Sequence, residues 1–497
     1  MPTSSRPVAP RSRHRPDRSV RRPARRSAGP PPRPAARRPG AGAALSALVC
    51  AALGACPVGA AGPADGDAGR AGADAGTAVE IARAGDGFEL RVGGAPFEVR
   101  GVGMGRTDEA AIAALAEAGG TAFRTWESED VAAQLDAAER HGLRVLVGLD
   151  AGKELAGFDY RDRAAVAAQH ERLTAFVDAH ADHPAVLGWI VANEPNLVVG
   201  ADGATVAADP AVYDALGRIV EHVHRSVPRR PATIAFAFTA TLEADVRAAL
   251  ERVPALDFVS FQAYGALPAV PETVERLGLD RPFMVTEYGP LGHWEMPSTP
   301  WGREIEEPSG PKADGLVARA GPTLFEAPDP RLIGAFAFLW GAKQERTPTW
   351  YGLLLDTGER TASADALGRL WTGAWPANRA PAARAIAIDG KSAFDAVRLA
   401  PGARASARVE LVDPEGDPLE IEWTLRTEVA LRSVGGHPEE TPPAVALERL
   451  DERVAPGEAR LDFRAPRRPG EYRLYAVARD GRGGAATANL PFLVETR

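Results

Sequence analysis

The chain has 497 residues, too many for one ordinary domain, and its 45% hydrophobic and 25% charged residues are typical of a globular protein. Residues 1–56 hold twelve arginines and one acid, so the rest of the chain carries 46 basic and 65 acidic residues, a net charge of −19. Because nucleic-acid binding needs basic surface, this balance argues against a nucleic-acid partner, whereas a polysaccharide is compatible with it.

An uncharged apolar run, AALSALVCAALGA at 43–55, follows an arginine- and proline-rich segment. It is too short to span a bilayer comfortably and is typical of a signal peptide. Leu53-Gly54-Ala55-Cys56 resembles a bacterial lipoprotein box, which implies a lipid anchor at Cys56; cleavage after Ala60 or Ala61 would instead give a secreted protein. We expect a leader at 1–56, a flexible tether at 57–77 and an extracytoplasmic protein that meets the membrane through its lipid only.

Both cysteines, Cys50 and Cys56, belong to this leader, so the folded part has neither a disulfide nor thiol chemistry. Neither a cofactor nor a metal site is expected.

Two short apolar runs around Gly93-Gly94 predict a hairpin at the start of the next domain. From Arg100 the pattern alternates between strand and helix, with Thr107, Ser128 and Asp209 as predicted helix caps. The predicted strands lie at 101–103, 121–126, 144–150, 186–194, 233–237, 257–264, 283–287 and 332–340.

Eight strands with helices between most of them predict an α/β fold, a (β/α)8 TIM barrel at 78–374. A linker is predicted at 375–384. Short apolar runs between Pro/Gly turns, without helical periodicity, predict an all-β sandwich at 385–497.

Two glutamates end predicted barrel strands. The run 186–191 stops at Ala192-Asn193-Glu194-Pro195, because Pro195 cannot donate a ladder hydrogen bond, and the run 283–285 leads to Glu287. A TIM barrel builds its active site at the carboxyl ends of its strands. A pair of carboxylates across that mouth suits glycoside hydrolysis.

These motifs resemble a known family. Asn193-Glu194-Pro195 matches the end of strand 4 in clan A glycoside hydrolases, and Thr286-Glu287-Tyr288-Gly289 resembles strand 7 of the family 2 barrels in that clan. The resemblance covers about residues 95–374. It implies a retaining hydrolase of β-linked O-glycosides that acts through a covalent glycosyl-enzyme, with Glu194 as acid/base and Glu287 as nucleophile.

The resemblance also implies substrate-binding roles around the two glutamates. Arg124 and Tyr264 would lie beside the nucleophile, with core packing as the alternative for Tyr264, and Asn193 would hold a sugar hydroxyl. Trp340, by its place at the end of the eighth strand, would form the floor on which a sugar ring stacks, with simple core packing as the alternative. The C-terminal segment resembles cadherin-like or immunoglobulin-like modules appended to bacterial glycosidases.

Several alternatives stay open. The same carboxylates serve a glucanosyltransferase-like transglycosylase, in which a sugar takes the place of water, and a catalytically silent carbohydrate-binding barrel would share the fold. Gln262-Ala263 stands where family 2 enzymes often have an asparagine, so the sugar and linkage are not assigned. His293, Trp294 and Trp301, in the long loop after the seventh strand, suit either sugar stacking or packing of the loop.

Overall fold

The computed structural model describes residues 77–126, 130–437 and 439–496. The predicted leader with Cys56, the tether apart from its last residue, and the predicted cap Ser128 lie outside the described residues. All described residues belong to one compact unit.

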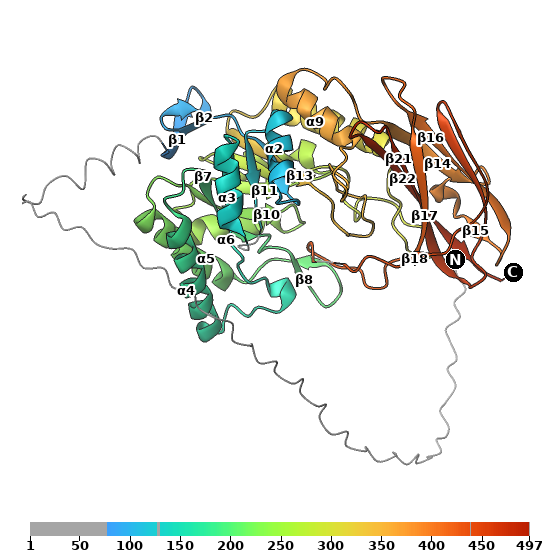
Figure 1. Ribbon diagram of the computed structural model, residues 1–497. Helices are drawn as coiled ribbons and strands as arrows, with labels where there is room; N and C mark the ends of the chain where they lie inside the picture. The colour runs from blue at the N-terminus through green and yellow to red at the C-terminus, as the bar shows by residue number, and fades with distance from the viewer. Residues whose placement is uncertain (1–76, 127–129, 438, 497) are drawn as a thin grey trace, which may run out of the picture. The chain divides into compact units, whose positions relative to one another are not determined.

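Eight parallel strands close into a barrel in which β13 pairs with β4 (Figure 1). This arrangement confirms the predicted barrel. Its strands are β4 (Arg100–Met104), β5 (Ala122–Arg124), β6 (Arg144–Gly148), β7 (Val186–Asn193), β10 (Ala232–Ala237), β11 (Val259–Gln262), β12 (Phe283–Tyr288) and β13 (Leu332–Trp340).

Helices follow the strands and cover the outside of the barrel. They are α2 (Glu109–Glu117), α3 (Val131–Arg140), α4 (Arg163–His180), α5 (Pro210–Ser226), α6 (Leu242–Arg252), α7 (Val270–Leu277), α8 (Ser309–Ala320) and α9 (Ala362–Thr372). Asp209 caps α5 as predicted, since its side chain accepts from the backbone N–H of Ala211. The predicted cap Thr107 is wrong, because Asp108 caps α2 through the N–H of Ala111.

The segment before the barrel forms three antiparallel strands, β1 (Val79–Ala84), β2 (Gly87–Val92) and β3 (Ala95–Pro96). The predicted hairpin is the β2–β3 pair, and β1 adds to it along the whole of β2. Val79 and Leu90 pack with residues of the barrel interior, including Ile190. The Phe88 N–H donates to Pro330 O, just before β13, so this small sheet closes the amino end of the barrel.

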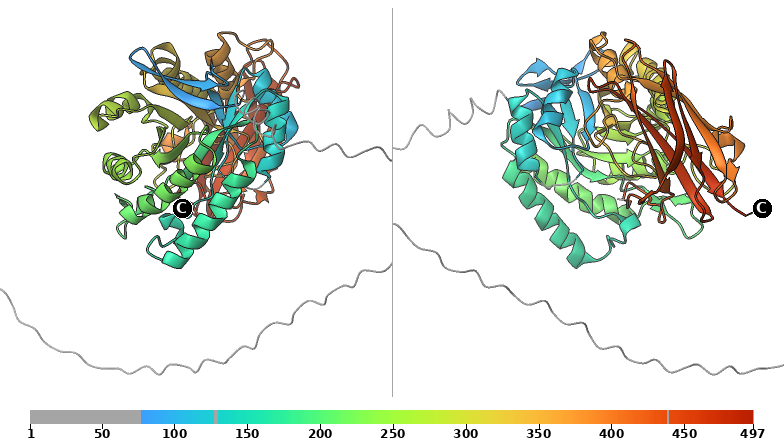
Figure 2. Two further views of the ribbon diagram at one scale, coloured as in Figure 1. Left: turned by 90° about the vertical axis from the view of Figure 1, so that its left-hand side faces the viewer. Right: turned by 45° about the vertical axis from the view of Figure 1, so that its right-hand side comes forward.

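Two sheets follow the barrel, as predicted, and bury one apolar core between them (Figure 2). Their strands pair antiparallel, apart from the short β15, which pairs with β22 in parallel. Along β16 every second residue is buried, which is the pattern of a sheet with one face on a core. One sheet is ordered β14 (Ala382–Ile388), β16 (Arg404–Val412), β20 (Glu458–Arg464), β19 (Glu448–Ala455); the other is β15 (Arg398–Leu399), β22 (Ala485–Val494), β21 (Gly470–Arg479), β17 (Glu420–Thr427), β18 (Ala444–Val445).

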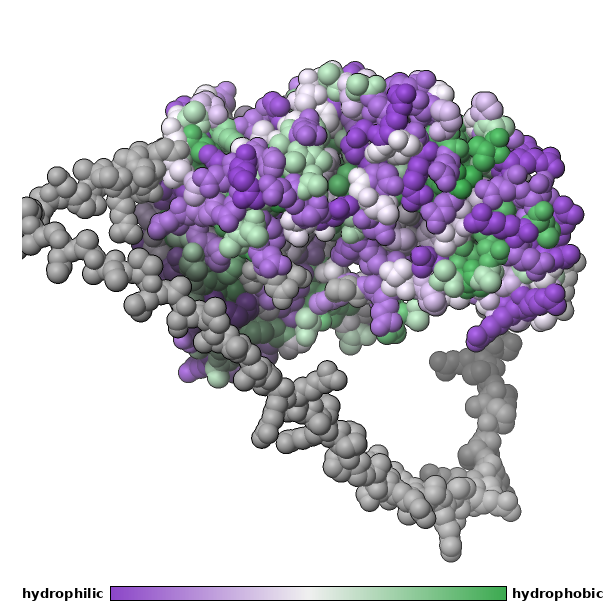
Figure 3. Space-filling view, viewed as in Figure 1, coloured by the Kyte–Doolittle hydropathy of each residue, from purple (hydrophilic) through white to green (hydrophobic). Residues whose placement is uncertain are grey.

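Polar side chains dominate the described surface visible in Figure 3, with smaller hydrophobic patches between them. Among the helices of the described residues, none combines the length and the apolar character needed to cross a membrane.

Candidate active site

Glu194 lies in the turn directly after β7, at the carboxyl end of the barrel. Its backbone φ is 53°, in the left-handed region that a non-glycine residue adopts only at a cost. The turn is held by Asn196, whose buried side-chain amide donates to Ala237 O and accepts from Ala237 N at 2.9 Å each, on neighbouring β10. The backbone N–H of Glu194 also donates to Ala235 O at 2.7 Å. The strained turn is therefore fixed firmly to the barrel, as is common at functional sites.

Glu287, in β12, is only 6% exposed and receives three side-chain donors. Its Oε1 accepts from Arg124 Nη1 at 3.2 Å and from Trp126 Nε1 at 2.8 Å. Its Oε2 accepts from the Tyr264 hydroxyl at 2.8 Å. Donors on both oxygens stabilise the ionised carboxylate and fix its orientation.

Asn193, the last residue of β7, joins this network through its side-chain oxygen. Oδ1 accepts from Arg124 Nη2 at 2.7 Å and from Gln262 Nε2 at 2.6 Å. Gln262, which stands where family 2 enzymes often have an asparagine, thus donates to Asn193 in this protein. Because both bonds go to Oδ1, the side-chain nitrogen of Asn193 is not engaged by these two donors.

Burial and nearby charges raise the pKa values of Glu194 and Tyr264 at the mouth. Burial, reinforced by the charge of Glu287, raises the pKa of Glu194 from its usual value to about 7, although Lys153 and Arg124 oppose the shift. Burial and the Glu287 carboxylate also raise the pKa of Tyr264 well above its usual value, so its phenol remains a donor. Glu194 can hold a proton near neutral pH beside a hydrogen-bonded carboxylate.

Aromatic rings surround the Glu287 side of the mouth. The ring of Phe338 lies 5.4 Å from that of Trp126, 5.9 Å from that of Tyr264 and 5.5 Å from that of Tyr351, each roughly edge to face. Trp294, which is 60% exposed, packs its ring 5.4 Å from that of Tyr264. These rings support the side chains that hold Glu287 and leave one indole facing solvent.

The predicted sugar floor Trp340 does not join this group. Trp340 is fully buried, and its Nε1 donates to Ala111 O of α2 at 2.9 Å, so it packs between strand and helix. The reason is a register shift: between Ala337 and Trp340, β13 contains one residue more than the facing part of β4. One extra residue reverses the side-chain alternation of a strand.

The structure therefore brings Arg124, Asn193, Glu194, Tyr264 and Glu287 together, and places Trp340 elsewhere. Sequence reasoning missed Trp126, although an indole two residues after Arg124, where β5 ends, was a visible signal.

A second missed group lies beside Glu194. Glu345 is 5% exposed and its charge acts on Glu194. Its carboxylate contacts His293 Nε2 at 3.3 Å and accepts from Lys343 Nζ at 2.7 Å. Burial opposes ionisation, but His293 and Lys343 outweigh it and lower the pKa of Glu345 to about 2. His293 thus has a charged partner at the mouth, whereas Trp301 packs under Arg398 of the sandwich.

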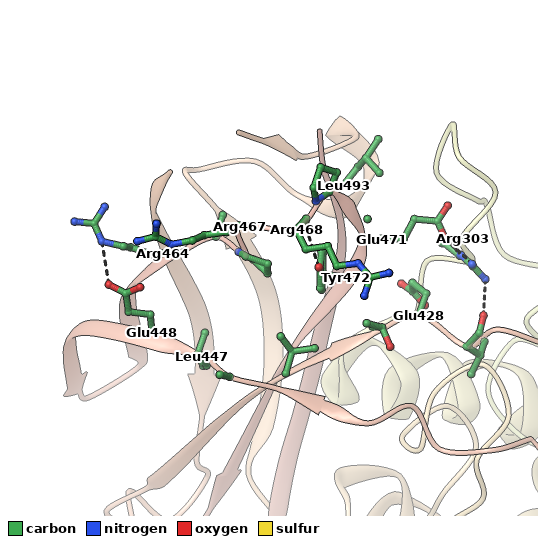
Figure 4. A pocket seen from close by; sticks show the side chains of 18 of the residues that line it. Arg303, Glu428, Leu447, Glu448, Arg464, Arg467, Arg468, Glu471, Tyr472 and Leu493 are labelled. Carbon is green, nitrogen blue, oxygen red and sulfur yellow. Dashed lines mark hydrogen bonds and ion pairs between the residues drawn. The ribbon is translucent and has the colours of Figure 1, made fainter. Parts of the chain in front are cut away.

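A separate surface groove lies in the sandwich and is lined by arginine, glutamate and apolar side chains (Figure 4). Arg464 pairs with Glu448 there at 3.1 Å, and Arg303 pairs with Glu471. The groove contains neither Glu194 nor Glu287, so the candidate catalytic groups belong to the barrel mouth alone.

The fold and site define a TIM-barrel protein with the carboxyl groups of Glu194 and Glu287 at its mouth, and comparison with solved structures gives distant similarity to glycoside hydrolases. The β-glucuronidase 2 of Bacteroides uniformis has a TM-score of 0.45 at 14% identity, over 84% of this chain and 48% of that chain. The β-glucuronidase of Ruminococcus gnavus has a TM-score of 0.45 at 16% identity, over 60% and 53%. The GH53 catalytic domain of Ignisphaera aggregans has a TM-score of 0.39 at 15% identity, over 52% and 88%.

This chain therefore spans about half the length of the two β-glucuronidases. No known family model matches the chain, and no curated protein sequence matches it.

Proposed function

We propose that this protein is a retaining glycoside hydrolase that acts on β-linked O-glycosides. The observation that carries the proposal is the contrast between its two carboxyl groups. Glu287 receives donors from Arg124, Trp126 and Tyr264, while the pKa of Glu194 is raised to about 7 by burial and by the charge of Glu287. A nucleophile needs the first environment and a general acid the second.

In the first step, a Glu287 oxygen attacks the anomeric carbon while Glu194 gives its proton to the departing glycosidic oxygen. The products are a glycosyl ester on Glu287 and the free alcohol of the leaving group. In the second step, the Glu194 carboxylate takes a proton from water, the hydroxide attacks the anomeric carbon, and the ester bond to Glu287 breaks. Both glutamates end in their starting protonation states.

The side chains around Glu287 have defined parts in this sequence. Arg124, Trp126 and Tyr264 hold the attacking carboxylate in place and stabilise it again when the ester breaks. The turn at Glu194 keeps the proton donor at the end of β7, where the hydrogen bonds of Asn196 to Ala237 tie the turn to β10.

Azide rescue of alanine variants tests the proposal. A panel of aryl β-glycosides first identifies a substrate for the wild-type protein. Glu194→Ala should lose turnover and regain it with azide, giving the β-glycosyl azide, whereas Glu287→Ala should give the inverted α-azide. Glu272→Ala removes an exposed carboxylate of α7 (77% exposed) and is the control, with wild-type turnover and no azide effect.

Exchange of the two azide products would reverse the assigned roles. Wild-type activity that survives in both glutamate variants would refute the carboxylate mechanism.

A further inference from the structure

The loop between β17 and β18, described at 428–437 and 439–443, leaves the sandwich and reaches the barrel. Figure 1 shows it extending toward β8 (Val198–Val199), which follows the Glu194 turn. Two parts of this loop matter: an anchor made by Arg432, Ser433 and Glu439, and a tip at 434–437. Each part contacts segments that follow barrel strands.

The anchor is built on Arg346, in the segment after β13. Arg346 is 7% exposed and forms a buried ion pair with Glu439, whose Oε2 also accepts the Arg346 backbone N–H at 2.6 Å. Arg346 Nη2 donates to Ser433 O at 2.9 Å. Arg432 adds a bond to Gly302 O at 2.8 Å. Buried charge-assisted bonds of this kind hold a loop in one position.

The tip crosses the barrel mouth between these fixed points. Gly435 and Gly436 have φ values of 67° and 75°, a turn that suits glycine. A Cβ on Gly435 would lie 2.7 Å from Leu155 and 3.1 Å from Leu197, and one on Gly436 would lie 3.2 Å from Lys343 Nζ. The backbone of the tip is therefore packed closely against segments that follow β6, β7 and β13.

The tip lies on the Glu194 side of the mouth. Lys153, whose Nζ is 3.5 Å from Gly435 O, acts electrostatically on Glu194. Glu345, next in sequence to the anchor residue Arg346, acts on Glu194 as well. In a retaining glycosidase the acid/base stands beside the oxygen of the leaving group.

We propose that the tip at 434–437 recognises the leaving group, so that the C-terminal sandwich completes the site and selects glycosides with a bulky leaving group such as a second sugar. This inference rests on the proposed hydrolase function. The residues of the tip are specificity-determining and take no part in proton transfer or nucleophilic attack.

The test compares two substrates of one sugar that differ in the leaving group. A β-glycosyl disaccharide places a sugar against the tip, whereas a β-glycosyl fluoride has no bulky leaving group; the fluoride is the anomer that a retaining enzyme accepts. Deletion of Gly435 and Gly436 should lower kcat/KM for the disaccharide by about tenfold or more, and change kcat/KM for the fluoride by less than about twofold. Leu431→Ala, on an 86% exposed residue of the same loop, is the matched control and should change neither.

A second variant keeps the backbone of the tip intact. Val434→Ser with His437→Ser alters only exposed side chains, and it should lower the disaccharide-to-fluoride ratio in the same direction. If the deletion variant fails to fold by circular dichroism, this variant decides alone. A ratio within about twofold of the wild type in every folded variant overturns the inference while the hydrolase proposal stands. Absence of wild-type turnover on both substrates and on the aryl panel refutes the hydrolase proposal itself.

Discussion

Arg124 and Glu287 form an ion pair between β5 and β12, with 3.2 Å between Nη1 and Oε1 and side-chain exposures of 0% and 8%. A pair so far removed from water gains little net stability, because desolvation of both charges opposes their attraction. Its effect is to fix the orientation of a carboxylate that also accepts from Trp126 and Tyr264. The site is thus organised around the position of one glutamate.

Tyr264→Phe removes one donor from Glu287 and keeps the ring. We expect kcat to fall by about 10- to 100-fold, since loss of one oriented donor at a reacting oxygen typically costs that much or more. Steady-state kinetics on an aryl β-glycoside measures the effect. Tyr213→Phe is the matched control, because this buried phenol of α5 donates to Asp245 at 3.1 Å, outside the group of residues that holds Glu287. An equal loss in both variants would contradict a specific role for Tyr264.

Variants of Phe338 and Trp340 should have different effects: the first should lower activity and the second should lower stability. Phe338→Ala removes the ring that contacts Trp126, Tyr264 and Tyr351, so we expect kcat/KM to fall through loss of support for the Glu287 donors. Trp340→Phe removes the bond to Ala111 O, and should lower the free energy of unfolding by about 1–3 kcal/mol with KM unchanged. Urea unfolding and steady-state kinetics measure the two effects. A raised KM with unchanged stability in Trp340→Phe would restore Trp340 as the sugar floor.

The contact between barrel and sandwich depends on a buried carboxylate. Glu306 is 4% exposed, and its carboxylate accepts hydrogen bonds from the side chains of Lys312, Thr347, Thr349 and, in β22, Asn489. Glu306→Gln leaves the Lys312 ammonium without its counter-charge, and should cost about 3–5 kcal/mol in urea unfolding.

The matched control for Glu306 is an exposed ion pair between α8 and β14, which also joins barrel and sandwich. Asp314 lies 2.9 Å from Arg384, and these side chains are 67% and 44% exposed. Asp314→Asn should cost no more than about 1 kcal/mol, because surface pairs contribute little. Equal costs for the two variants would show that burial of Glu306 does not govern the contact.

Much of the barrel was predictable, because its strands read as continuous apolar runs and Asp209-Pro210 has unambiguous capping chemistry. The strand-end rule also indicated Glu194 and Glu287. The prediction that Trp340 lies at the site was wrong because the pairing of β13 with β4 is irregular, and no residue pattern in β13 indicates this irregularity. The approach of Gly435 to Leu155 could not be predicted either, since it joins two domains through a loop without periodicity.

The leader sequence around Cys56 predicts where the protein is located in the cell. We propose that Cys56 is lipidated and that residues 57–77 tether the protein to a membrane. The acidic remainder of the chain would be repelled by anionic headgroups, so the anchor must be lipid. Cys56→Ala should move the protein to the soluble fraction, and mass spectrometry of the native protein should find its N-terminus at Cys56. An unlipidated N-terminus after Ala60 or Ala61 would identify a secreted protein.

The pH dependence of activity should report the proton on Glu194. Because burial and the charge of Glu287 raise the pKa of Glu194 to about 7, the acid form is present below that pH and is lost as pH rises through it. The proposed first step needs this proton, so kcat/KM for a substrate with a poor leaving group should fall above about pH 7. Glu194→Gln carries no titrating carboxyl, and for a dinitrophenyl glycoside, which needs no acid assistance, its kcat/KM should show no such fall. A fall near pH 7 that persists in Glu194→Gln would assign the titration to another group and remove Glu194 as the acid.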